Sequence, residues 1–157
     1  MKILGIDPGQ HCGLAYYNAG ELCETATVAP HQLPGAILDF WNANAVPKNT
    51  ADHNPIIVFE DSRLQSHVWV ADAYGKQKAH KIARNVGMVD MVCAIIAGLC
   101  VEHNIKHFAM SPRAKGAKIN AEQFALITCY TGHTNQHERD AAMVAWPYRM
   151  MRSGGVR

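Results

Sequence analysis

The stretch that decides the fold is residues 2–9, Lys-Ile-Leu-Gly-Ile-Asp-Pro-Gly. Its apolar run is broken at once by Pro8-Gly9, which predicts a β-strand that ends in a tight turn. Asp7 is the last residue before that turn. Because α/β proteins keep their sites at the carboxyl edge of the sheet, Asp7 is a candidate functional residue as well as a candidate turn former.

The residues that follow predict an α/β protein with a mixed sheet. Strands are expected over 12–18 and 21–29, which gives two hairpins, and an amphipathic helix is expected over 31–43. Residues 55–59 are continuously apolar and mostly β-branched, as in a strand that helices cover on both faces, and Glu60 ends this run.

The rest of the chain alternates helices with one strand. Residues 62–84 show no clean period, whereas 85–104 are apolar nearly all round, which indicates a central helix or one buried against another subunit. A strand over 106–110 and helices over 120–130 and 137–148 complete the pattern. We expect a single domain over 1–150 with helices on both faces of the sheet, followed by a basic tail over 151–157.

Composition bounds the function. The 157 residues are 48% hydrophobic and 18% charged, which suits one packed core and argues against disorder. The net charge of +2 hides an asymmetry, since 1–62 hold two basic and seven acidic residues and 63–157 hold thirteen basic and six acidic. A basic half of this kind is typical of proteins that bind a polyanion such as nucleic acid, although a merely solvated basic face is also common.

Cysteine usage and hydropathy indicate an intracellular protein. The five cysteines form no C-x-x-C pair and most lie in apolar segments, which predicts buried, reduced thiols. No leader pattern is present, and the longest apolar run, 91–101, is shorter than the ~20 residues that cross a bilayer. We therefore expect a soluble, cytoplasmic protein with no membrane partner.

Three acidic residues are candidate catalytic residues because of their positions in the predicted elements. Asp7 and Glu60 each end an apolar strand, and Asp140 lies on an alanine-rich helix one turn after His137. Carboxylates about 4 Å apart repel by roughly 1 kcal/mol per pair in water and about 4 kcal/mol at an intermediate dielectric, so a cluster of three indicates bound cations. Carboxylate sites select Mg²⁺ or Mn²⁺, and a pair of these ions promotes phosphodiester hydrolysis. Taken singly, each acid has a structural alternative, as a turn former, a strand-end charge or a solvated helix residue.

These motifs in order resemble the RuvC family of Holliday junction resolvases, which are crossover junction endonucleases. The resemblance rests on Ile-Leu-Gly-Ile-Asp7-Pro-Gly with Gly13, on Val-Phe-Glu60, and on His137-x-x-Asp140-Ala-Ala-x-x-Ala. It implies an RNase H-like fold, a homodimer joined through the 85–104 helix, and Mg²⁺-dependent paired nicking of four-way DNA junctions. Asp7, Glu60 and Asp140 would then be catalytic metal ligands, and His137 would take a fourth position as ligand or base.

The same resemblance implies DNA contacts in the basic half. The candidates are Arg63, Trp69, Tyr74, Lys76, Lys78, Lys81, Arg84, Arg113, Lys115 and Lys118. Lys118 is also a candidate catalytic residue, but which of Arg113, Lys115 and Lys118 lies near the scissile phosphate stays open. Either aromatic would stack on an opened base or pack under a loop. Residues 62–84 depart most from the family pattern.

Three other functions fit parts of the sequence. An RNase H-like nuclease acting on RNA or on other branched DNA would use the same acids. A junction-binding protein without catalysis would keep the basic residues. A sugar-kinase or actin-like ATPase shares the Asp-x-Gly turn but needs two such domains, for which the chain is too short, so no nucleotide cofactor is expected.

Overall fold

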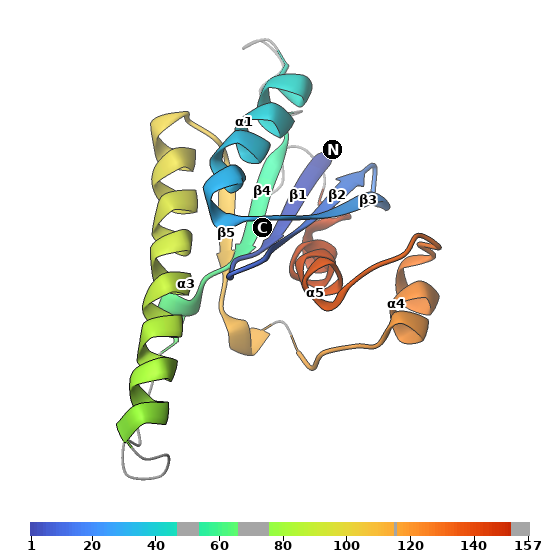
Figure 1. Cartoon of the computed structure of the whole chain (residues 1–157). Coiled ribbons are helices and arrows are strands. Elements are labelled where there is room, and N and C mark those ends of the chain that lie inside the picture. Colours follow the sequence, from blue (N-terminus) through green and yellow to red (C-terminus); the bar gives the residue numbers. More distant parts are fainter. Residues whose placement is uncertain (47–53, 66–75, 115, 152–157) are drawn as a thin grey trace.

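A mixed five-stranded sheet forms the centre of the protein (Figure 1). The computed structural model describes residues 1–46, 54–65, 76–114 and 116–151. The strands lie in the order β3-β2-β1-β4-β5, with antiparallel pairing among β1, β2 and β3 and parallel pairing of β4 with β1 and β5. Their bounds are β1 Lys2–Asp7, β2 Cys12–Asn18, β3 Glu21–Val28, β4 Ile56–Glu60 and β5 His107–Met110.

Helices cover both faces of this sheet, as the sequence predicts. Helices α1 and α3 pack on one face, and α4 and α5 lie on the other (Figure 1). Their bounds are α1 Leu33–Asn44, α3 Lys76–Glu102, α4 Ala121–Thr128 and α5 Gln136–Ala145. The fold class is therefore α/β, with a three-layer arrangement in which every central strand is buried on both sides.

The alternation of side chains divides the core in two. Leu4 and Ile6 of β1 belong to the cluster with α1 and α3, whereas Ile3 belongs to the cluster with α5. In β4, Phe59 lies in the first cluster and Val58 in the second. Because successive residues of a strand face opposite ways, Asp7 and Glu60 both fall on the α5 face.

Helix α3 begins earlier than the sequence suggests. The predicted helix spans 85–104, but α3 covers 27 residues from Lys76 to Glu102. Its first two turns are polar and largely exposed. Because they bury no apolar face, their sequence has no helical period of apolar residues. The helix ends two residues early because Asn104 adopts a left-handed φ of 53° and the amide of Ile105 bonds back to Cys100.

Among the described helices, residues 77–102 of α3 are long and apolar enough to cross a bilayer by length and composition. One side of this segment is core, since Val92, Cys93, Ile96 and Cys100 are buried against the sheet. The apolar composition of that side follows from packing.

The domain bounds of 1–150 and the tail over 151–157 stay predictions, and residues 152–157 lie outside the described part of the chain.

Candidate active site

Two glycines let α5 lie directly on the sheet. A β-carbon on Gly5 of β1 would stand 2.4 Å from the carbonyl oxygen of Ala141, and one on Gly13 of β2 would stand 2.0 Å from that of His137. Real side chains never approach so closely, so only glycine allows this packing. The result is that the first turn of α5 lies over the carboxyl end of β1.

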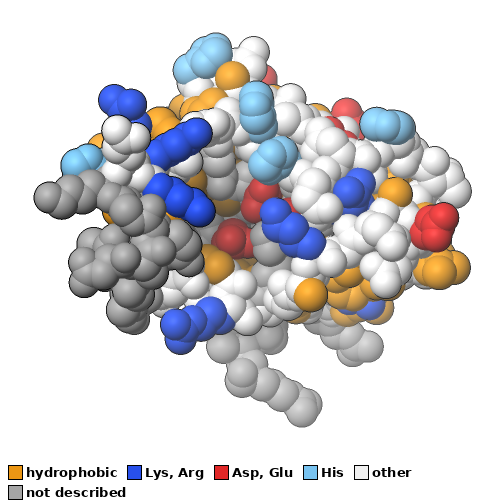
Figure 2. All heavy atoms as spheres, turned by 60° about the horizontal axis from the view of Figure 1, so that its bottom comes forward, with side chains coloured by type: hydrophobic (Ala, Val, Ile, Leu, Met, Phe, Trp, Pro, Cys, Tyr) orange, Lys and Arg blue, Asp and Glu red, His pale blue; other side chains and the backbone are white. Residues whose placement is uncertain are grey.

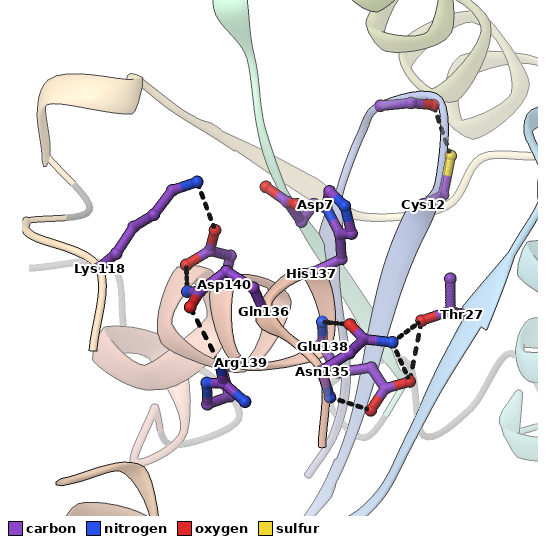
Figure 3. Close-up of polar contacts among 11 residues, drawn as sticks. Asp7, Cys12, Thr27, Lys118, Asn135, Gln136, His137, Glu138, Arg139 and Asp140 are labelled. Atoms are coloured by element: carbon purple, nitrogen blue, oxygen red, sulfur yellow. Dashed lines mark hydrogen bonds and ion pairs between the residues drawn. The ribbon is translucent and has the colours of Figure 1, made fainter. Parts of the chain in front are cut away.

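A polar network fixes that first turn to the edge strand. The side-chain oxygen of Asn135 caps α5 by accepting a hydrogen bond from the backbone amide of Glu138 at 3.1 Å. In return, the Glu138 carboxylate accepts one from the backbone amide of Asn135 at 3.2 Å. The same carboxylate accepts a hydrogen bond of 2.8 Å from the hydroxyl of Thr27 on β3 (Figure 3). It accepts another, of 3.2 Å, from the hydroxyl of Thr25 on the same strand. The capping box therefore anchors the helix as well as satisfying its first amides.

The strand register brings the first two acids to one edge. Strands β1 and β4 are parallel, with Ile6 opposite Phe59, so Asp7 and Glu60 occupy the next position on neighbouring strands. Asp7 is 8% exposed, and Oε2 of Glu60 is buried. A carboxylate at such a place carries a high desolvation cost unless polar or cationic groups surround it.

Asp7 contacts His137 across the sheet-helix boundary. Its Oδ2 lies 3.1 Å from Nδ1 of His137, whose side chain is 44% exposed (Figure 3). The carboxylate thereby orients the imidazole and turns its other ring nitrogen, Nε2, away from Asp7. The structure thus brings Asp7 and His137 into contact, and their joint role in a metal site stays a prediction.

Asp140 is buried within the same helix turn. Its side chain is 7% exposed, its Oδ1 accepts a hydrogen bond from Nε2 of Gln136 at 2.8 Å, and its Oδ2 lies 4.0 Å from the ammonium of Lys118 (Figure 3). Of the three basic candidates in this loop, Lys118 is the one whose described side chain lies close to Asp140. Arg113 lies in a short 3-10 turn after β5 and is exposed, and Lys115 is outside the described residues.

The donor set suits a hard divalent cation. Carboxylate oxygens are the ligands that Mg²⁺ prefers, and the burial of Asp7 and Asp140 is costly without a cation nearby. In the described part of the chain, no three His, Cys, Asp or Glu side chains lie close enough together to hold a metal ion as they stand. Asp7 instead contacts His137, and Asp140 contacts Gln136 and Lys118. That these acids ligate metal stays a prediction.

Basic side chains surround this edge. In Figure 2, acidic side chains lie in a hollow at the centre of the face, with Lys, Arg and His side chains around it. A cavity of about 710 Å³ is formed by the N-terminal half of α3 and by Gln10, in the turn that follows Asp7. We call it the basic groove; its lining is Gln10, Gln77, His80, Lys81, Arg84, Asn85 and Met88. Lys81 and Arg84 are thus predicted DNA contacts that share one concave surface.

Arg63 has a structural partner. Its guanidinium makes two hydrogen bonds of 2.8 Å to Asp61, one from Nε and one from Nη2. These bonds hold the pKa of the Asp61 carboxyl below its usual value and raise the pKa of Arg63. The pair holds the turn after Glu60, and the Arg63 side chain remains 38% exposed.

The remaining predicted DNA contacts are less defined. Lys78 is exposed on α3, one turn from Lys81. Trp69 and Tyr74 lie outside the described residues, and for Lys76 only the backbone, as the first residue of α3, is described. A role for any of them in DNA binding stays a prediction.

Two residues beside the acids, Glu138 and Arg139, are absent from the predicted site residues. Glu138 anchors α5 to β3, and Arg139 donates hydrogen bonds to Gln136 and to two loop carbonyls. The Asn-x-x-Glu spacing at 135–138 is a capping-box signature that would have identified Glu138. Gln136 and Asp140 are four residues apart, the spacing of a side-chain hydrogen bond on a helix, but the helix expected over 137–148 begins one residue too late to include Gln136.

The comparisons with known proteins bear on the fold. No family model matches the chain, and no curated protein matches it. Among solved structures, it is similar to T. thermophilus RuvC in complex with a Holliday junction substrate, with a TM-score of 0.56 over 93% of this chain and 90% of that chain. The fold is RNase H-like. At 15% identity the likeness shows the fold alone, and it confirms the predicted mixed five-stranded sheet with helices on both faces.

Proposed function

We propose that this protein is a metal-dependent endonuclease that resolves four-way DNA junctions by paired phosphodiester hydrolysis. The observation that carries the proposal is that Asp7 and Glu60 end neighbouring parallel strands on the face that α5 covers, while Asp140 is buried on α5 and a basic groove lies beside Asp7. Support for the substrate comes from the RNase H-like fold shared with a RuvC protein that was solved on a Holliday junction, and from the ordered motifs of the sequence.

The acids would hold Mg²⁺, or Mn²⁺ in its place. Asp7, Glu60 and Asp140 are the proposed carboxylate ligands, and His137 is the proposed fourth group. When bound, a pair of such ions activates water and stabilises negative charge on the leaving 3′-oxygen. Asp7 also holds the His137 ring through Nδ1, so that Nε2 is the nitrogen that would accept a proton or face a cation.

The basic side chains would position the nucleic acid. Lys118, whose ammonium lies 4.0 Å from Asp140, would contact the phosphate that is cut. Lys81 and Arg84 would contact backbone phosphates in the basic groove, giving affinity that depends on salt and little on sequence. A nuclease of this kind acts on DNA inside the cell, so a cytoplasmic location belongs to the proposal.

A homodimer would present two such sites to the two strands that must be cut. The proposed contact is the outer face of α3, where Met88, Met91 and Ile95 are 39%, 62% and 44% exposed. These residues recur at the three- and four-residue spacing that places side chains on one helix face. They also line an apolar cavity of about 430 Å³ with Pro30 and His31, which a second copy would fill.

The test compares synthetic four-way junctions with forks, linear duplex and structured RNA, each incubated with the protein and Mg²⁺. We expect paired, symmetric nicks in the junction and none in linear duplex. Asp7→Asn should abolish nicking while leaving junction binding intact, because it removes one ligand charge and keeps the shape. Cleavage of forks or RNA in preference to junctions would favour a different RNase H-like nuclease. Tight binding with no cleavage at any metal concentration would instead indicate a junction-binding protein.

A further inference from the structure

The two oxygens of the Asp140 carboxylate have different surroundings. Oδ1 accepts a 2.8 Å hydrogen bond from Gln136, which lies one turn earlier on the same helix. Oδ2 lies 4.0 Å from the ammonium of Lys118, whose side chain is 72% exposed. One oxygen is thus bound by a half-buried neutral donor and the other faces a cation on an exposed side chain.

Arg139 determines which end of the Gln136 amide faces Asp140. A glutamine amide can rotate by half a turn and exchange its donor for its acceptor. Here the Nη2 of Arg139 donates a 3.0 Å hydrogen bond to Oε1 of Gln136, so the amide nitrogen is directed to Asp140 (Figure 3). The opposite orientation would set a carbonyl oxygen against a carboxylate and a nitrogen against a guanidinium.

Arg139 is itself held by the loops that flank the site. Its Nε donates to the carbonyl of Ile119 at 3.2 Å, and its Nη1 donates to the carbonyl of Thr134 at 2.8 Å. Ile119 follows Lys118 directly, so Arg139 donates on one side to the loop that carries the lysine. On the other side it donates to Gln136, which in turn donates to Asp140, the acid that the lysine faces.

We propose that Gln136 is a positioning residue for divalent-cation binding, which occupies Oδ1 of Asp140 and presents Oδ2 to the cation. This inference rests on the proposed function, because it takes Asp140 as a metal ligand. Outer hydrogen bonds that orient a ligand typically change metal affinity by about 10- to 100-fold when removed. Gln136 therefore contributes to metal affinity without touching the metal.

Calorimetric titration of Mn²⁺ into the full chain, without DNA, tests the inference. Gln136→Met keeps the size of the side chain and removes the donor, and we expect Mn²⁺ binding that is 10- to 100-fold weaker than in the wild type. Gln136→Asn keeps an amide but is too short to reach, and it should weaken binding similarly. Gln123→Met, which removes an equivalent amide from the α4 capping box, is the matched control and should bind Mn²⁺ as the wild type does.

A second readout separates positioning from a purely structural role. If Gln136 acts through metal affinity, nicking by Gln136→Met should recover at high Mg²⁺ concentration, whereas a distorted site would stay inactive. Wild-type Mn²⁺ affinity in both Gln136 variants would overturn the inference while leaving the nuclease proposal standing. If Asp140→Asn binds Mn²⁺ as tightly as the wild type, Asp140 is not a ligand, and both the inference and the proposed metal site fall.

Discussion

At Gly13, a β-carbon would lie 2.0 Å from the carbonyl oxygen of His137 and 2.9 Å from the amide of Glu138, both in the backbone of α5. Gly13→Ala must therefore push the helix off the sheet. We expect a loss of unfolding free energy of about 3 kcal/mol, the upper range for overpacking, and a large loss of nicking because His137 and Asp140 move with the helix. Chemical denaturation and a junction-cleavage assay measure the two effects.

The matched control is Gly35→Ala in α1, where an added β-carbon meets nothing within 4 Å. Alanine is the better helix former, so this change should raise stability by about 0.5 kcal/mol and leave nicking unchanged. If Gly13→Ala behaves like Gly35→Ala, the close contact between α5 and β2 does not position the site.

The first half of α3 lines the basic groove that we propose binds the DNA. Replacing Lys81 and Arg84 by alanine removes two charges from the basic groove. We expect weaker junction binding and a logarithmic salt dependence whose slope falls by about 1 for each residue, with the unfolding free energy nearly unchanged. Fluorescence anisotropy over a series of salt concentrations measures the slope.

Lys106→Ala is the control for the groove. Lys106 is exposed and precedes β5, so it lies at the amino end of that strand, whereas the groove lies beside the carboxyl edge. Its replacement should leave the salt slope within error of the wild type. An equal loss from Lys106→Ala would mean that the protein binds DNA through its overall charge and not through the groove.

The second half of α3 carries the proposed dimer contact. Met91→Glu sets a charge in the centre of the exposed apolar stripe, and we expect it to convert a dimer into a folded monomer. Sedimentation velocity measures the change. Val101→Glu is the control, because Val101 is 69% exposed against 62% for Met91 but lies at a different angle around the helix. A wild-type protein that sediments as a monomer at high concentration would contradict this interface.

At the scale of the whole molecule, packing divides the cysteines into two classes. Cys12, Cys93 and Cys100 are buried, whereas Cys23 and Cys129 are exposed, and all five are free thiols. Burial raises the pKa of Cys100 to about 11 and also raises those of Cys12 and Cys93. Since the thiolate is the reactive form, we expect two cysteines to react with a thiol reagent at pH 8 in the folded protein.

The other three should react only in denaturant. Counting modified thiols over time, with and without denaturant, checks this prediction. Fast reaction of Cys12 in the native state would show that the turn beside Asp7 opens, which would contradict the close packing of the β1 and β2 ends. The apolar neighbours of the cysteines predict buried thiols, which is wrong for Cys23 on the edge strand β3 and for Cys129 at the end of α4.

Much of this protein follows from local pattern. The strand over 2–7, its turn and the acid at its end were predictable because apolar runs and turn residues act over a few positions. The same holds for Glu60 at the end of β4 and for the alanine-rich face of α5. Helix α3 was predicted only where it packs on the core, since periodicity reports burial and its exposed first turns have none.

What the tertiary structure decided is which polar groups meet. The approach of α5 to β1 and β2 brings His137 to Asp7, although 130 positions separate them in sequence. It also turns Glu138 toward β3, and the loop before α4 brings Lys118 to Oδ2 of Asp140. No sequence period encodes these contacts, because each depends on the distance between two elements and on side-chain directions that exist only after the layers have packed.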